Sequence, residues 1–280
     1  MERKIIITVA LSGGGRADKT NNPHIPETPE EIVDSAYKCW QAGAAIVHIH
    51  ARDDKNKVTS DPEVYKRIHS MIRERCDIIL QDSTGLGPDV KMEERINVID
   101  AGAEMASLNM GTLVRSGIDD SLFLNTPSQI ETYVKRMLEI GVKPELEVYN
   151  HSMFRDVETL IAKNLLTKPY LINLVLGMSY QGGLAATPKN LLSLVEYLPK
   201  EDCVFNVSAV GKAQLHLTTL SMLIGGNVRV GLEDNLYYQK GQVATNEMLA
   251  ERAVRLAREL QFEVATPDEA RDILAIPRLS

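Results

Sequence analysis

Several features are scarce or missing in this chain of 280 residues, and each shortage excludes a class of protein. The three cysteines, Cys39, Cys76 and Cys203, are too few and too scattered for a disulfide framework or a cysteine-ligated metal cluster. They indicate a reducing compartment such as the cytoplasm. No apolar run approaches the roughly 18 residues of a membrane span. No lysine- or arginine-rich run occurs and the net charge is −7, so we expect neither nucleic acid nor a membrane as a partner.

What the chain does contain is a regular alternation of β-branched apolar segments and helical patterns. Helix starts are marked by pairs such as Thr28-Pro29 and Asp61-Pro62, in which the first residue caps the helix and proline fits its first turn. Strands that alternate with helices of about 10–15 residues imply a parallel sheet. The expected strands cover residues 4–10, 44–50, 78–85, 104–111, 144–150, 170–177, 203–211 and 228–235.

Eight strand–helix units in this length predict an α/β fold, a closed (β/α)8 TIM barrel. We expect a single domain over residues 1–280, with a short helical extension at the C-terminus. An open doubly wound sheet is the alternative, which the even count and regular spacing disfavour.

Histidine is also scarce, at six residues, yet His48 and His50 end the same expected strand. Side chains alternate across a strand, and the opposite face, with Ala45, Val47 and Ile49, is wholly apolar. The two imidazoles should therefore point into the barrel near its C-terminal mouth, where barrel enzymes keep their active sites.

Polar residues recur late on the inward face of most other expected strands. Burying so many polar groups costs free energy unless they are paired or serve a ligand. The pattern therefore favours a functional mouth over a purely structural barrel. The residues are Gln81, Ser83, Ser107, Asn109, Glu145, Glu147, Tyr149, Asn173, Asn206, Ser208, Arg229 and Glu233.

Two histidines and one carboxylate are typical of a metal site with an open coordination position. Glu233 is expected at the height of His48 and His50, which suits Zn²⁺ acting as a Lewis acid. Non-haem iron uses a similar trio, so the identity of the metal stays open. The alternative is that both histidines only form hydrogen bonds with neighbours at the mouth.

Asp234 follows Glu233 directly and can enter the mouth where the strand ends. A carboxylate beside a metal and an arginine stays ionised and can act as a general base. Arg229 shares the inward face with Glu233, so it could orient Asp234 or bind a substrate carboxylate. The alternative is a structural ion pair between Glu233 and Arg229.

Two further segments are weaker indicators. The glycines in SGGGR at 12–16 let the backbone approach a ligand, but no dinucleotide or P-loop fingerprint follows, so a flexible loop is favoured. His151 follows the fifth expected strand and could be a mouth residue or a helix cap. His24, His69 and His216 fall in loop or helix patterns without a functional signal.

Over essentially its whole length the chain resembles the β-keto acid cleavage enzymes, also called the 3-keto-5-aminohexanoate cleavage enzyme family. The resemblance depends on ETPEEI at 27–32, AGAAIVHIHARD at 42–53, QDSTG at 81–85, ASLNMGT at 106–112, PELEVYN at 144–150, VRVGLEDNLYYQKG at 228–241 and ATPDEARDIL at 265–274.

The resemblance implies a reaction between a 3-keto acid and acetyl-CoA that yields acetoacetate and a new acyl-CoA. It implies one Zn²⁺ per chain on His48, His50 and Glu233, with acetyl-CoA as co-substrate, a metal-stabilised enolate and retro-Claisen cleavage. Asp234 and Arg229 match the catalytic pair. Family members are homo-oligomers, often tetramers. The positions that match substrate contacts, or adjoin those that do, are Ser83, Thr84, Gly85, Ser107 and Asn109.

One departure from the family concerns the first strand–helix loop. Members that act on amino-bearing substrates carry an acid there, whereas this chain has Ser12 followed by three glycines. The resemblance therefore implies a keto acid without a positive charge at its far end. Arg16 could favour a second carboxylate, or could be a solvated residue beside Asp18.

Two other functions stay open at this point. A metal-dependent hydrolase barrel also uses an HxH pair and a late aspartate, but it places the pair on the first strand and needs further histidines. A barrel that binds a metal or ligand without catalysis is the other alternative.

Overall fold

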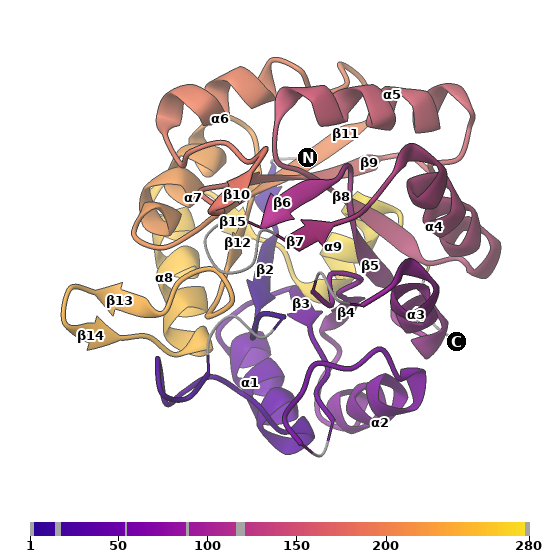
Figure 1. Ribbon diagram of the computed structural model, residues 1–280. Helices are drawn as coiled ribbons and strands as arrows, with labels where there is room; N and C mark the ends of the chain where they lie inside the picture. The colour runs from indigo at the N-terminus through magenta and orange to yellow at the C-terminus, as the bar shows by residue number, and fades with distance from the viewer. Residues whose placement is uncertain (1–2, 15–17, 54, 88–89, 116–120, 278–280) are drawn as a thin grey trace.

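The computed structural model describes residues 3–14, 18–53, 55–87, 90–115 and 121–277 (Figure 1). Within these residues eight parallel strands close into a barrel, in the order β2-β3-β4-β5-β8-β9-β11-β12 and back to β2, which confirms the predicted fold. The strands are β2 (Ile7–Ala10), β3 (Ile46–Ile49), β4 (Ile79–Asp82), β5 (Met105–Asn109), β8 (Lys143–Val148), β9 (Tyr170–Leu176), β11 (Cys203–Ala209) and β12 (Asn227–Val230).

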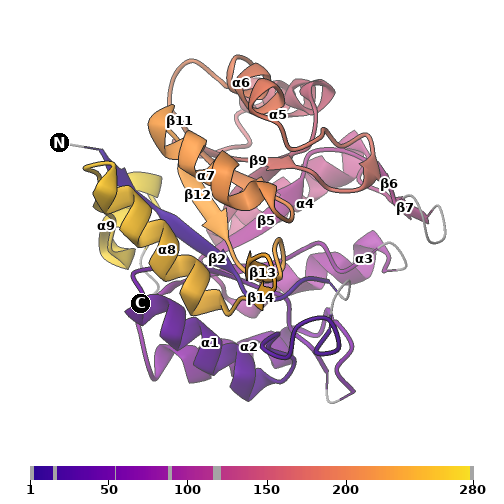
Figure 2. The same cartoon turned by 90° about the vertical axis from the view of Figure 1, so that its left-hand side faces the viewer.

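Helices surround the barrel, with α1 and α2 on one side of the strands and α5 and α6 on the other (Figure 2). Thr28 caps the first helix as predicted, because its side chain accepts a hydrogen bond from the Glu31 amide in a capping box. No helix of the described residues is long and apolar enough to cross a membrane. The helices are α1 (Pro29–Gln41), α2 (Pro62–Arg73), α3 (Met92–Arg95), α4 (Pro127–Ile140), α5 (Phe154–Ala162), α6 (Pro188–Val195), α7 (Ala213–Leu223), α8 (Asn246–Glu259) and α9 (Pro267–Leu274).

The third helix is shorter than the pattern over residues 88–103 indicates. Only α3 is α-helical, and the chain continues as the 3₁₀ helix η1 (Ile96–Ala101) until Gly102 adopts φ 87°. Lys91 at the N-cap makes no capping hydrogen bond, and the β-branched residues of η1 favour the α-helix less. Residues 88 and 89 lie outside the described residues.

Short strands outside the barrel were not expected from the sequence. The loops after β5 and β9 join in a three-stranded antiparallel sheet, which we call the mouth sheet, made of β6 (Leu113–Arg115), β7 (Ser121–Phe123) and β10 (Tyr180–Gln181). A hairpin follows β12, with strands β13 (Tyr237–Gln239) and β14 (Gln242–Val243). In Figure 1 the mouth sheet is drawn in front of the barrel strands.

The C-terminal helix closes the other end of the barrel. Ala270 and Leu274 of α9 pack with Ile6, Ile46 and other residues from the beginnings of the strands in a cluster that is buried throughout. β1 (Lys4–Ile5) and β15 (Glu263–Val264) pair in parallel and so place α9 there. Because apolar side chains of the described residues fill this end, the mouth is the end at which a ligand can be expected to enter.

A buried carboxylate holds this closure in place. Glu104 accepts hydrogen bonds from Arg271 Nε of α9 at 2.6 Å, from the Leu80 amide at 3.2 Å, and from Arg73. We expect Glu104→Ala to lower the free energy of unfolding by about 3 kcal/mol, since it removes a buried carboxylate shared by two guanidiniums and leaves the buried Nε of Arg271 without its partner. Urea denaturation measures this. Glu263→Ala, which removes an exposed partner of Lys4, should cost less than about 1 kcal/mol, and equal losses would contradict the argument.

Candidate active site

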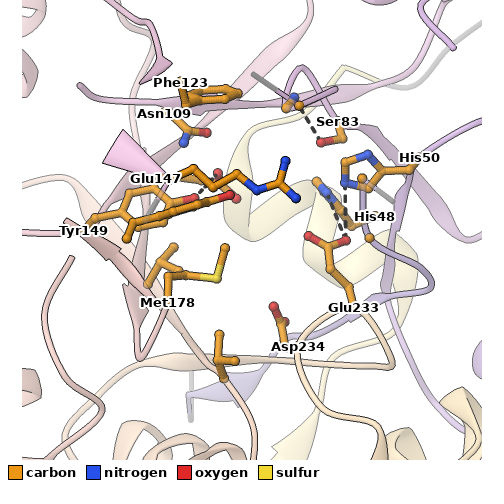
Figure 3. A pocket seen from close by; sticks show the side chains of 18 of the residues that line it. His48, His50, Ser83, Asn109, Phe123, Glu147, Tyr149, Met178, Glu233 and Asp234 are labelled. Atoms are coloured by element: carbon orange, nitrogen blue, oxygen red, sulfur yellow. Dashed lines mark hydrogen bonds and ion pairs between the residues drawn. The ribbon is translucent and has the colours of Figure 1, made fainter. Parts of the chain in front are cut away.

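A pocket opens at the C-terminal mouth, and most of the predicted site residues line it (Figure 3). Two of them, Thr84 and Ser107, do not line it: both are buried, and the Thr84 hydroxyl donates to the Ser107 carbonyl at 2.7 Å. This hydrogen bond joins the ends of β4 and β5 next to the lining residues Ser83 and Asn109. The predicted residues that line it are His48, His50, Ser83, Gly85, Asn109, Arg229, Glu233 and Asp234.

A turn after β12 brings the adjacent acids Glu233 and Asp234 into the pocket. The strand ends at Val230, earlier than predicted, and Gly231 adopts φ 131°. A Cβ on Gly231 would lie 2.1 Å from the Ala10 carbonyl oxygen of β2, so only glycine fits there. Glu233 therefore reaches the mouth from a turn and not from the strand on which we expected it.

His48, His50 and Glu233 converge on one point. Glu233 Oε2 lies 3.6 Å from His48 Nε2 and 3.4 Å from His50 Nε2. The ligand atoms of the three residues all lie within 4.8 Å of one another. Two ligands of a tetrahedral zinc ion lie about 3.4 Å apart, given ordinary metal–ligand distances.

The surroundings of this trio also fit a metal ion. His48 Nδ1 lies 2.8 Å from Gln81 Oε1, which fixes the proton on Nδ1 and leaves Nε2 free as a ligand. Burial lowers the pKa of His48 to about 3, so its imidazole is neutral. Glu233 Oε2 is buried and has no hydrogen-bond partner among the described residues.

Arg229 lies at the centre of a carboxylate cluster. Its Nε and Nη2 bind the two oxygens of Asp234 at 3.0 and 3.2 Å, a bidentate pair. Its Nη2 also donates to Glu233 at 2.6 Å, and its Nη1 to Glu147 at 3.2 Å. When all three carboxylates are ionised, they and the guanidinium carry a net charge of −2, which a divalent cation beside Glu233 would neutralise.

Burial and Arg229 act on these acids in opposite directions. Burial raises the pKa of Asp234 above its ordinary value, and Arg229 opposes that rise. For Glu233 burial likewise raises the pKa, but Arg229 and the two imidazoles together hold it below its ordinary value. The arrangement therefore offers an ionised metal ligand and, next to it, a more basic carboxylate.

Comparison with known proteins shows the family of the chain. Residues 4–276 match the family described as beta-keto acid cleavage enzyme. The chain belongs to this family. It is 41% identical to the 3-keto-5-aminohexanoate cleavage enzyme of Acetoanaerobium sticklandii, over 98% of this chain and 99% of that protein. It is 29% identical to the 3-oxoadipate:acetyl-CoA acetyltransferase of Cupriavidus necator, over 100% of this chain and 97% of that protein.

A solved structure supports the fold of this keto acid cleavage enzyme. The apo structure of ObcA superposes with a TM-score of 0.78 and 21% identity, over 91% of this chain and 66% of that chain. At this identity the likeness concerns the barrel alone. The predicted family and the predicted fold are both confirmed.

Glu147 is a pocket residue of this keto acid cleavage enzyme that we did not assign from the sequence. The alternation along the fifth strand placed it inward, but alternation alone could not tell it from Glu145 below it. Glu145 is bound by Asn206 at 3.1 Å and belongs to a buried structural network. Glu147 instead faces Arg229 and accepts a hydrogen bond from the Tyr149 hydroxyl at 3.1 Å.

Other sequence candidates lie elsewhere or outside the described residues. His151 lies in the 3₁₀ helix η2 (His151–Met153), and its Nε2 is 2.8 Å from Ser193 Oγ, so it does not line the pocket. His69 contacts Asp82 at 2.9 Å. Gly15 and Arg16 lie outside the described residues. Gly14 does line the pocket, and a Cβ there would lie 3.0 Å from the Gly85 carbonyl oxygen, so this part of the loop packs closely.

Glu147 leads to a pH prediction for the enzyme freed of metal by a chelator. Burial raises its pKa to about 7 from 4.5, although Arg229 opposes the rise. Between about pH 4.5 and 7 the folded protein therefore keeps a proton that the unfolded chain releases. The contribution of Glu147 to the free energy of unfolding is fully present below about pH 4.5 and is lost as the pH rises through about 7. Relative to the wild type, Glu147→Gln should gain about 2 kcal/mol of unfolding free energy between pH 5 and 7.5. Denaturation curves at both pH values test this, with the exposed Glu139→Gln as control; parallel profiles would contradict it.

Proposed function

We propose that this protein cleaves a 3-keto acid with acetyl-CoA, giving acetoacetate and the acyl-CoA of the remaining fragment. The observation that carries the proposal is the bidentate Asp234–Arg229 pair beside the His48, His50 and Glu233 trio, in a chain of this family. The names of its relatives, which include an acetyl-CoA transferase of 3-oxoadipate, support the same reaction.

Asp234 is the base in this proposal. Held by Arg229, one of its oxygens takes the proton from the carbon between the ketone and the carboxylate of the substrate. Burial makes Asp234 more basic than an exposed aspartate, while the guanidinium keeps it ionised and oriented. His48, His50 and Glu233 would hold a divalent cation, which would supply positive charge to polarise the ketone oxygen.

The remaining steps redistribute bonds without an oxidant or reductant. The enolate carbon attacks the thioester carbonyl of acetyl-CoA, and the CoA thiolate leaves. The thiolate then adds to the original ketone carbon, and the bond between that carbon and the former enolate carbon breaks. Acyl-CoA and the enolate of acetoacetate result, and Asp234 returns its proton to the latter. Ser83 and Asn109, which line the pocket, can donate hydrogen bonds to the substrate carboxylate.

Several finer properties belong to the proposal. We propose Zn²⁺ as the metal, one ion per chain, because the trio combines two imidazoles with one carboxylate. The substrate contacts of Thr84, Gly85 and Ser107, the homotetramer, the cytoplasmic location and the single domain are kept as predictions. A hydrolase is disfavoured by the family match and by the place of His151 outside the pocket.

The test is a product assay. Purified, metal-loaded protein is mixed with acetyl-CoA and a panel of 3-keto acids, and acetoacetate and acyl-CoA are quantified together. We expect the two products in equal amounts from at least one keto acid. Metal-loaded protein that yields no acetoacetate from any member of the panel would favour a barrel that binds ligands without catalysis.

A further inference from the structure

The mouth sheet contributes side chains to the lining of the pocket. Arg115 of β6, Phe123 of β7 and Tyr180 of β10 all line the pocket, as does Met178 just before β10. Figure 3 shows Phe123, Tyr149 and Met178 across the pocket from His48, His50 and Glu233. A substrate whose ketone lies at the trio can extend its far end toward these residues.

The charges that line the pocket are unevenly paired. Its acids are Glu147, Glu233 and Asp234, and all three lie within hydrogen-bond distance of Arg229. No acid among the described lining residues is therefore left to bind an ammonium group. Arg115 is different: it lines the pocket, is half-buried, and has no carboxylate partner among the described residues.

Strand pairing on both sides fixes the backbone of Arg115. It lies in β6 opposite Tyr180 of β10 and opposite Ser121 of β7, in the middle strand of the mouth sheet. A cation held on a paired strand at the rim of a pocket is preorganised for an anion, because little freedom is lost on binding. Nearby Phe123 and Met178 offer apolar surface for the methylene groups that would link two charged ends.

We propose that Arg115 binds the far carboxylate of the keto acid, so that the preferred substrate is a 3-keto dicarboxylate. The proposal deepens the proposed function and rests on it. The phosphates of acetyl-CoA are the other possible source of anionic oxygens at the mouth, and the kinetic constants separate the two sources, because each belongs to a different substrate.

The experiment compares two keto acids of equal length in the metal-loaded enzyme: 3-oxoadipate, with two carboxylates, and 3-oxohexanoate, with one. Arg115→Gln should lower kcat/KM for 3-oxoadipate by about 10- to 100-fold, mainly through KM, as expected for the loss of a hydrogen bond to a charged group. The value for 3-oxohexanoate and the KM for acetyl-CoA should change less than about 3-fold. Arg115→Lys should restore part of the preference, and the exposed Arg155→Gln is the matched control.

Two outcomes overturn the proposal. A rise in KM for acetyl-CoA with equal losses on both keto acids assigns Arg115 to the phosphates of CoA. The wild type could instead prefer 3-oxohexanoate or an amino-bearing keto acid, with the preference unchanged by Arg115→Gln. This result would show that Arg115 does not determine the substrate preference.

A binding measurement keeps the test independent of turnover. By calorimetry on metal-loaded protein, adipate should bind at least about 10-fold more tightly than hexanoate, and Arg115→Gln should abolish the difference. If no keto acid is cleaved but this discrimination is present, the proposed reaction fails while the carboxylate site stands. If the discrimination is absent, the carboxylate site fails whatever the activity.

Discussion

Asp234→Asn is expected to lower kcat by about 10³-fold while the metal content stays at one ion per chain. General base catalysis contributes about 10²- to 10⁴-fold, and an amide cannot accept the proton that this step removes. The side chain keeps its size and can still accept a hydrogen bond from Arg229, which now holds Asp234 at 3.0 and 3.2 Å. The loss should therefore appear in kcat and leave the KM for the keto acid nearly unchanged.

The measurement combines steady-state kinetics with elemental analysis of the same preparation. Asp100→Asn is the matched control, because it removes an exposed carboxylate that pairs with Arg136 far from the pocket, and it should have wild-type activity. Loss of metal from Asp234→Asn would place Asp234 among the metal ligands. Unchanged kcat would rule it out as the base.

His48→Ala should abolish both metal binding and turnover. The imidazole is neutral, and its Nε2 is directed at Glu233 Oε2. Because Gln81 binds the other ring nitrogen, Nε2 is available to bind a metal ion. Its loss leaves two ligands, which do not hold zinc against a chelator at the affinity of a three-ligand site. We expect less than about a tenth of an ion per chain after dialysis, and activity lower by about 10³-fold or more.

His151→Ala is the control for the metal prediction. This histidine lies near the end of β8 but contacts Ser193 and the ring of Tyr197 away from the pocket. The variant should keep its metal and its activity. If His48→Ala binds as much metal as the wild type, the trio is not the metal site, and the account of the ketone-polarising cation is wrong.

The barrel could be predicted from local signals because its elements are regular. Thr28, Asp61 and Thr126 cap helices that begin with proline, and β-branched runs fill the strands. The mouth sheet could not be predicted, since its strands have two or three residues and β6 pairs with β10 across more than 60 residues of sequence. A short C-terminal helix was expected, but its contacts at the base of the barrel could not be predicted, as the contact of Arg271 with Glu104 spans 167 positions.

The site residues likewise differ in whether local sequence signals could predict them. Side-chain alternation placed His48, His50 and Arg229 inside the mouth, and all three line the pocket. Alternation could not reveal the turn at Gly231, which depends on the close approach of the Ala10 carbonyl from another strand. Nor could it show that Glu147 faces Arg229, or that Arg115 reaches the pocket, because both depend on which loops and strands meet in space.

The pairing of β1 with β15 has a practical consequence for purification. It sets β1, at the start of the described chain, beside β15, which leads into α9, at the closed base across the barrel from the pocket. An affinity tag fused to either end should leave substrate entry unobstructed. A polyhistidine tag would nevertheless bind ions of its own, so it should be cleaved off before metal is counted.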